Sequence, residues 1–211
     1  MKKKLLATGI LALCLVFSAF TLLHEIPAEI EVGSKLPKGD VKLKDVSGKE
    51  ISLNNAMGKN GLLVVFTCNT CPYVLGWMDR IKESVLHASN FQIGTMLINS
   101  NEALRSGKAS DDSFEAMVEF HKKNELGAPY VLDENSVLAD AFGATRTPQV
   151  FLFDKEGTLV YKGAIDDSPK TAADIKEFYL RDAIGALSNG KEVSVKATKS
   201  IGCTIKRVHK H

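Results

Sequence analysis

LLVVFTCNTCPYVLGW, residues 62–77, joins an unbroken apolar run to two cysteines and a proline. The apolar residues 62–66 are branched or aromatic, a pattern typical of a strand that is buried on both faces. Pro72 fits the first position of a helix, because the N–H group that it lacks would have no partner there. We therefore expect a strand, a cysteine pair and then a helix, with Cys71 at the helix N-cap.

The residues after Pro72 have the periodicity of an amphipathic helix. Apolar side chains recur at i, i+3, i+4, i+7 and i+11, which places them on one helical face. These side chains are Val74, Trp77, Met78, Ile81 and Val85. The unpaired N–H groups and the dipole at a helix N-terminus favour an anion, and therefore favour a thiolate over a thiol. Cys71 is accordingly the predicted nucleophile.

Cys68 lies three residues before Cys71, in the predicted turn between the strand and the helix. It is either the disulfide partner of Cys71 or only a neighbour. Both cysteines could instead be ordinary core residues, since free cysteine is among the most buried residue types. We favour a redox site, because a C-x-x-C motif between an apolar strand and an amphipathic helix is typical of one.

Two longer patterns accompany the cysteine pair. The first is F-x-x-N-x-C-P-x-V, and its residues are Phe66, Asn69, Cys71, Pro72 and Val74. The second is G-C-x-I-K, and its residues are Gly202, Cys203, Ile205 and Lys206. With Thr147-Pro148 and the apolar run after it, these patterns resemble the thioredoxin-like superfamily, and within it the redoxin or AhpC/TSA-type proteins. The resemblance spans about residues 32–207.

The resemblance implies a fold and a set of site residues. The fold is α/β and thioredoxin-like, with a central mixed sheet flanked by helices and an N-terminal β-hairpin. In the superfamily the proline of the Thr-Pro pair is cis and lies beside the active-site cysteines, where the preceding backbone can pair with an extended substrate. Thr147, Pro148 and Pro72 are therefore expected to bind substrate. From the residues alone, Pro148 could equally be a trans proline at the start of a strand.

The cysteine motif departs from those of the relatives. In thioredoxins the nucleophile is the first cysteine of C-x-x-C and lies five residues after a strand phenylalanine. Counted from Phe66, that position is Cys71, and Val74 occupies the place of the second cysteine. Peroxiredoxins carry a threonine three residues before the peroxidatic cysteine, where this chain has Cys68. The motif is thus shifted one turn upstream of the thioredoxin motif, and it does not meet the peroxidase signature.

The composition suits one globular domain with a leader. The chain has 211 residues, a mass of 23.0 kDa, a formal net charge of +2 and 25% charged residues. This length can bury a sizeable core, and the charge balance gives no reason to expect a nucleic-acid partner. Glycine-rich phosphate-binding motifs are absent from the sequence. No cofactor and no resident metal is expected.

The N-terminus has the pattern of an export signal. Lys2, Lys3 and Lys4 precede the uncharged run 5–23. Such a start places the rest of the chain outside the cytoplasm. The run is longer than a usual signal core of roughly 7–15 residues and close to the roughly 20 that span a bilayer. We expect a periplasmic or cell-envelope protein, anchored in the inner membrane through residues 5–23 if the leader is retained.

The remaining segments follow from local patterns. The predicted divisions are a signal peptide or anchor (1–24), a linker (25–36), a thioredoxin-like redoxin domain (37–190) and a basic tail carrying Cys203 (191–211). Within the domain we expect hairpins at 41–53 and 149–163, a strand at 91–100, a strand and a helix within 129–144, and helices at 113–123 and 171–187.

Three cysteines fall in the predicted exported part, and this odd count leaves one of them free or acting as a resolving partner. The pairs Cys68–Cys71, Cys71–Cys203 and Cys68–Cys203 all stay open, because distances cannot be read from sequence. The leading hypothesis is a thiol-disulfide oxidoreductase in which the Cys71 thiolate attacks a disulfide and Cys68 or Cys203 resolves the mixed disulfide. Its partners are a protein or small-molecule disulfide or thiol and an unidentified electron donor.

Three alternatives come from other kinds of protein. A thiol peroxidase would oxidise Cys71 to a sulfenic acid, and Arg146 is the only arginine expected near the site. A copper-binding module would use Cys68, Cys71 and a histidine, because thiolates suit Cu(I). A non-catalytic envelope module would leave Cys71 with the reactivity of a free thiol.

Overall fold

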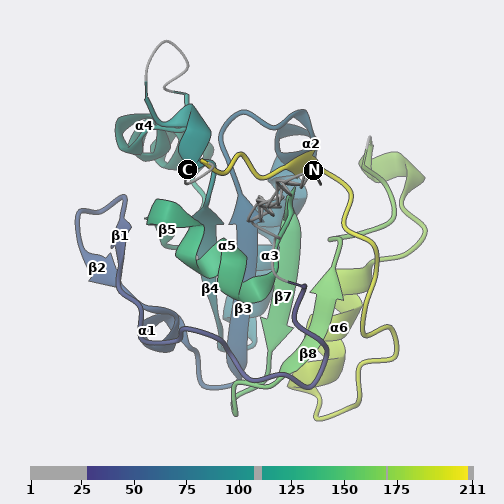
Figure 1. The fold of residues 1–211 in the computed structure, drawn as a ribbon. Coiled ribbons are helices and arrows are strands. Elements are labelled where there is room, and N and C mark those ends of the chain that lie inside the picture. The colour runs from purple at the N-terminus through teal and green to yellow at the C-terminus, as the bar shows by residue number, and fades with distance from the viewer. Residues whose placement is uncertain (1–27, 107–110, 170, 209–211) are drawn as a thin grey trace, which may run out of the picture.

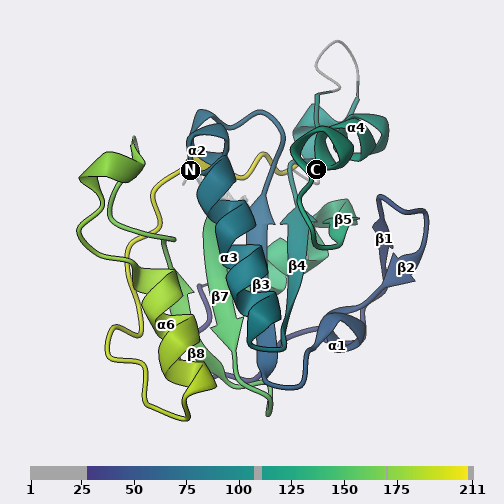
Figure 2. The same ribbon diagram turned by 180° about the vertical axis from the view of Figure 1, so that it is seen from behind.

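The computed structural model describes residues 28–106, 111–169 and 171–208. A seven-stranded mixed sheet with the order β2-β1-β5-β4-β3-β7-β8 forms its centre (Figures 1 and 2). The strands are β1 (Leu43–Asp45), β2 (Glu50–Ile51), β3 (Gly61–Thr67), β4 (Ile93–Asn99), β5 (Tyr130–Leu132), β7 (Gln149–Phe153) and β8 (Leu159–Gly163). A separate pair joins β6 (Arg146–Thr147) to β9 (Cys203–Thr204). This architecture confirms the predicted α/β class.

Helices cover both faces of the sheet. They are α1 (Leu53–Ala56), α2 (Pro72–Gly76), α3 (Met78–Asn90), α4 (Phe114–Asn124), α5 (Val137–Phe142) and α6 (Tyr179–Ser188). Figure 2 shows α3 and α6 on one face, and Figure 1 shows α5 on the other. Two apolar cores result, one on each side of the sheet.

The central strand β3 explains the apolar run that opens the cysteine stretch. It lies between β4, which is parallel to it, and β7, which is antiparallel. All seven of its residues are buried. Successive side chains alternate between the two cores, so that Leu63 and Val65 enter one while Val64 and Phe66 enter the other. The predicted strand buried on both faces is therefore confirmed.

The helix after Cys71 is interrupted. Cys71 is the N-cap of α2 and Pro72 its first residue, as predicted. The single helix expected through Val85 is wrong, because Trp77 has φ −98° and ψ 3° and separates α2 from α3. At this break the Trp77 indole Nε1 donates to Asp166 Oδ1 at 2.9 Å. The apolar periodicity predicts which face of the helix is buried, but it carries no information about the contact between Trp77 and Asp166.

The last helix is shorter than its predicted span of 171–187. Helix α6 begins only at Tyr179, and a single 3₁₀ turn lies at Ala172–Asp174. The Asp167 carboxylate accepts hydrogen bonds from the backbone N–H groups of Lys176 and Glu177 at 2.9 and 3.1 Å. These N–H groups are therefore not available to a continuous helix.

The other predicted elements are confirmed with small differences in their ends. Strands β1 and β2 form the N-terminal hairpin, and β7 and β8 the later one. Helix α4 has the N-cap Ser113, and α5 ends at Gly143 in a left-handed conformation with φ 62°.

The segments predicted as linker and tail lie against the sheet where they are described. Gly33 N donates to Leu159 O at 2.8 Å, and Thr198 N donates to Lys162 O at 3.0 Å. Both segments thus add hydrogen bonds along β8. The predicted leader, 1–24, lies outside the described residues. Among the helices of the described residues, none has the length and apolar character needed to cross a bilayer.

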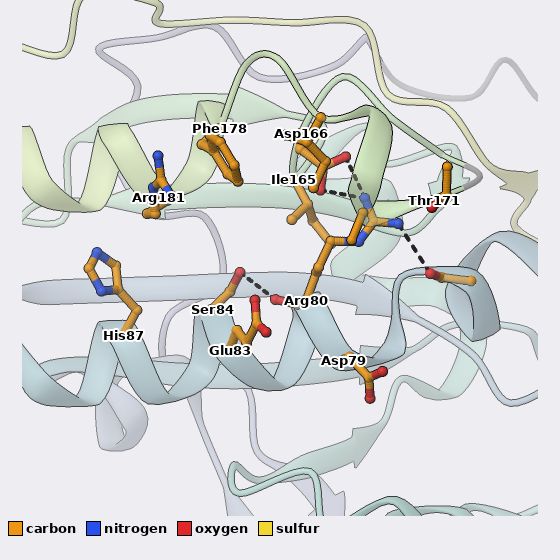
Figure 3. A pocket seen from close by; sticks show the side chains of 13 residues that line it. Asp79, Arg80, Glu83, Ser84, His87, Ile165, Asp166, Thr171, Phe178 and Arg181 are labelled. Carbon is orange, nitrogen blue, oxygen red and sulfur yellow. Dashed lines mark hydrogen bonds and ion pairs between the residues drawn. The ribbon is translucent and has the colours of Figure 1, made fainter.

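A buried ion pair joins α3 to the loop after β8 (Figure 3). Arg80 Nη1 donates to both carboxylate oxygens of Asp166 at 2.7 and 2.8 Å and to Ser168 O at 2.6 Å. The pair borders a pocket of about 620 Å³, and none of the three thiols lines this pocket. We assign the pair a structural role.

Asp166→Ala is expected to lower the free energy of unfolding by about 3–5 kcal/mol, because it leaves the buried Arg80 guanidinium without a counter-charge. Urea unfolding followed by circular dichroism measures this loss. Glu156→Ala is the control, since Glu156 pairs with Lys155 on the surface, and removing it should change stability by less than about 0.5 kcal/mol. Equal losses in the two variants would contradict the assigned role.

Candidate active site

Three segments bring three cysteines to one end of β3. Cys68 directly follows β3, Cys71 caps α2, and Cys203 lies in the short strand β9. Figure 1 shows the yellow C-terminal segment passing beside α2. Cys68 and Cys71 are buried, with exposed fractions of 0% and 3%, whereas Cys203 is partly exposed. The structure thus brings together the three predicted thiols.

Thr147 is the residue that all three cysteines adjoin. The Cys71 thiol donates to the Thr147 carbonyl oxygen at 3.1 Å. Cys68 Sγ lies 3.4 Å from Thr147 Oγ1. Cys203 is directly opposite Thr147 in the antiparallel pair of β6 and β9. The Thr147-Pro148 peptide bond is cis, as the resemblance implies.

The surroundings of Cys71 favour its thiolate. The hydrogen bond from the Cys68 thiol lowers the pKa of Cys71 to about 4, and bonds from the Cys203 thiol and the Val74 N–H act in the same direction. Burial of the sulfur opposes this shift. When Cys71 loses its proton, it no longer donates to Thr147 O. Its sulfur instead accepts hydrogen bonds from the thiols of Cys68 and Cys203.

The neighbouring thiols stay protonated at neutral pH. Donation to Cys71 raises the pKa of Cys68 strongly, and burial together with the negative charge of Asp112 adds to this shift. Burial and, after it, the adjacent Cys71 together raise the pKa of Cys203 to about 11. The site therefore contains one thiolate and two thiol donors, and the pKa of Cys203 is raised less than that of Cys68.

Backbone contacts fix the position of Cys203. Gly202 packs so closely on Thr147 that a Cβ at this position would overlap the Thr147 carbonyl oxygen. Ile205, which is 3% exposed, inserts into the core on the α5 side of the sheet, and its N–H donates to Thr145 O at 3.0 Å. Residues 202–205 of the predicted tail are thus part of the site.

Arg146 and Pro72 lie at the edges of the site. The exposed Arg146 side chain donates to Thr204 Oγ1 at 3.1 Å and to Gly202 O at 3.4 Å. Arg146 was expected near the site, and its side chain contacts β9 there. Pro72 is exposed at the first position of α2.

Asp112 is a site residue that the sequence analysis did not identify. Its carboxylate is completely buried behind the cysteine turn. It accepts hydrogen bonds from Asn69 N at 2.8 Å, Thr70 Oγ1 at 3.1 Å, Asn99 Nδ2 at 2.9 Å and Asn101 Nδ2 at 3.1 Å. Asp112 therefore positions the two residues between Cys68 and Cys71. Because these partners come from two other segments of the chain, no local pattern points to the contact.

No group of three or more histidine, cysteine, aspartate or glutamate side chains that could hold a metal ion occurs among residues 28–106, 111–169 and 171–208.

Comparison with known proteins places the chain in a family. The sequence model of the AhpC/TSA family matches residues 32–162. This chain belongs to the AhpC/TSA family. It is also 26% identical over 172 residues to the thiol-disulfide oxidoreductase ResA of Bacillus subtilis, covering 76% of this chain and 86% of that protein. Family membership and this similarity support an oxidoreductase with a thiol redox function.

Two solved structures are similar over most of their length. A hypothetical protein from Sinorhizobium meliloti 1021 is 30% identical, with a TM-score of 0.77, and covers 87% of this chain and 98% of its own. An uncharacterized conserved protein from Geobacillus kaustophilus is 28% identical, with a TM-score of 0.78, and covers 86% of this chain and 94% of its own. The chain therefore shares its fold with these two proteins over most of its length.

Alkylation of Cys71 is expected to follow its low pKa. In the reduced protein its rate should rise with pH around pH 4 and then stay level, because the thiolate is the reacting species. Cys68→Ala removes the largest stabilising bond, and the rise should move toward the ordinary value of 9.0. Iodoacetamide labelling at a series of pH values, with mass spectrometry of the Cys71 peptide, measures both profiles.

The control for this measurement is Cys203→Ala, which should move the Cys71 profile in the same direction but less. Identical profiles for Cys68→Ala and the wild type would refute the assigned role of Cys68.

Asp112→Asn should lower the free energy of unfolding by about 1–3 kcal/mol, because an amide cannot accept from every donor around it. The Asn69 amide, which donates to Asp112, should also exchange faster with solvent. Urea unfolding and amide hydrogen exchange measure the two effects. Asp111→Asn changes an exposed neighbour and should leave both unchanged; an equal response there would contradict the positioning role of Asp112.

Proposed function

We propose that this protein is a thiol-disulfide oxidoreductase in which Cys71 is the nucleophile and Cys203 the resolving thiol. The observation that carries the proposal is the meeting of both cysteines at Thr147: the Cys71 thiol contacts its carbonyl oxygen and Cys203 pairs with it across two strands, while the neighbouring thiols stabilise the Cys71 thiolate. Similarity to a thiol-disulfide oxidoreductase supports the same reaction class.

In the first step, the Cys71 thiolate attacks one sulfur of a disulfide R–S–S–R. A bond forms between Cys71 Sγ and that sulfur, and RS⁻ leaves. The Cys203 thiol then loses its proton and attacks Cys71 Sγ, which forms the Cys71–Cys203 disulfide and releases the second RS⁻. The substrate gains two electrons and the protein loses two. An external thiol donor returns the protein to its reduced form.

Cys203 suits the resolving role better than Cys68. A resolving thiol must attack as the thiolate. The raised pKa of Cys68 reflects complete burial and the charge of Asp112 as well as its bond to Cys71. Once Cys71 is in a mixed disulfide, its charge no longer opposes ionisation of either neighbour, but burial and Asp112 still oppose that of Cys68. We assign Cys68 the role of a hydrogen-bond donor to the Cys71 thiolate.

The place of action in this proposal is outside the cytoplasm. Three lysines followed by the uncharged run 5–23 support export, with retention of that run giving a membrane anchor. The proposed setting is therefore the periplasm or the cell envelope.

Mass-spectrometric mapping of the thiols tests the proposal. Reduced protein treated with one equivalent of glutathione disulfide should form the Cys71–Cys203 bond and keep Cys68 free. Cys203→Ser should stop at glutathione bound to Cys71, and Cys71→Ser should not be modified at this rate. Cys68→Ala should still form the Cys71–Cys203 bond, but more slowly at pH 5, where fewer of its Cys71 thiols are ionised.

Two results would overturn the proposal in different ways. A Cys68–Cys71 bond in the wild type would transfer the resolving role to Cys68. Reaction of Cys71 no faster than that of free cysteine would refute the oxidoreductase activity.

A further inference from the structure

The C-terminal strand β9 occupies the backbone edge beside the nucleophile. In the antiparallel pair, Cys203 lies opposite Thr147 and Thr204 opposite Arg146. The Ile205 N–H extends the pairing by donating to Thr145 O at 3.0 Å. The edge of β6 next to Cys71 is therefore filled by the chain itself.

Contacts on both sides hold β9 in this place. After it, Arg207 donates to Asp140 Oδ1 at 2.8 Å and to Ala144 O at 2.7 Å. Before it, the Thr198 hydroxyl is hydrogen-bonded to Tyr161 Oη and accepts from Ala164 N, at 2.9 Å in each case. Only residues 199–202 lie between Thr198 and Cys203, and only residues 204–206 lie between Cys203 and Arg207. The strand is thus fastened at both ends rather than trailing from one.

An exposed strand edge is a general docking place for extended polypeptides, because it offers unpaired N–H and C=O groups. A segment of the same chain that pairs there competes at an effective concentration in the mM range or above. An external peptide would have to displace β9 and its anchors in order to pair with Thr147. Cys71 itself is only 3% exposed, which further restricts a bulky partner.

We propose that β9 makes the enzyme selective for small-molecule disulfides, by filling the edge on which an extended polypeptide substrate would pair. This inference rests on the proposed function, since it takes Cys71 as the nucleophile. Gly202 is the specificity-determining residue, because its lack of a side chain lets β9 lie against the Thr147 carbonyl. The substrate is then a compact disulfide of two thiols, reduced by the two balanced steps given above.

The test compares two symmetrical disulfides in single turnovers of the full-length reduced protein. One is glutathione disulfide, and the other is a disulfide-linked dimer of an extended peptide of about ten residues, long enough to pair along a strand edge. The reaction is stopped with acid at successive times, and mass spectrometry measures the fraction of Cys71 that is still a free thiol. The decay of this fraction gives the rate of the first step. The wild type should react with glutathione disulfide about tenfold faster or more, because β9 opposes pairing of the peptide.

Gly202→Ala should displace β9 and raise the peptide-dimer rate, relative to the glutathione disulfide rate, by about tenfold or more, because the tethered competitor is removed. The control is Gly185→Ala on α6, where an added Cβ meets open space, and it should leave the ratio unchanged. Ile205→Ala loosens β9 through its buried anchor and should shift the ratio in the same direction if Gly202→Ala does not fold. Faster amide hydrogen exchange at Thr147 reports the displacement.

Equal wild-type rates for the two disulfides would overturn the inference while leaving the proposed function intact. The inference would also be overturned if faster amide hydrogen exchange at Thr147 showed that Gly202→Ala or Ile205→Ala displaces β9, while the ratio of the peptide-dimer rate to the glutathione disulfide rate stayed at its wild-type value. Failure of Cys71 to react with either disulfide would instead refute the proposed function.

Discussion

The backbone and side chain of Thr147 adjoin the three thiols of the site, and most of the surrounding structure serves to hold them there. The thiols of Cys71 and Cys68 contact its carbonyl and hydroxyl oxygens, while Cys203 pairs with it across two strands. Thr147 is the last residue of β6, and only Pro148 separates it from β7, which pairs with the central strand β3. The apolar sheet thus sets the positions of the sulfurs, because displacing any one of these strands would separate them.

Placing three thiols together makes them chemically unequal. The sulfur at the N-cap of α2 receives hydrogen bonds and becomes the thiolate, while Cys68 and Cys203 donate to it and retain their protons. Burial deepens the difference at Cys68, where the neighbouring Asp112 also disfavours a negative charge. The site therefore has a single preferred nucleophile, chosen by position rather than by residue type.

The sequence was informative where the signal is local and less so where it depends on contacts between distant segments. The buried strand, the Cys71 cap and the hairpins could be predicted, since periodicity and Pro72 act within a few residues. The break at Trp77 could not, because its indole reaches Asp166 far along the chain. Asp112 could not be identified for the same reason, because its partners lie on the cysteine turn and at the end of β4. The position of Cys203 opposite Thr147 likewise depends on a strand pairing between segments 56 residues apart.

The upstream shift of the C-x-x-C motif and the ordered tail have a common physical explanation. The second cysteine of this motif is the anionic one, because at the N-cap of α2 it accepts hydrogen bonds from the thiols of Cys68 and Cys203 and from the Val74 N–H. The first cysteine then lies at the buried end of β3, where desolvation opposes the ionisation that a resolving thiol needs. Val74, at the place of the usual second cysteine, offers no sulfur on the helix. A resolving thiol must therefore come from elsewhere in the chain, and β9 delivers Cys203 beside Cys71 at a less buried position. The same strand that completes the chemistry closes the backbone edge of the site, which connects the mechanism to the choice of substrate.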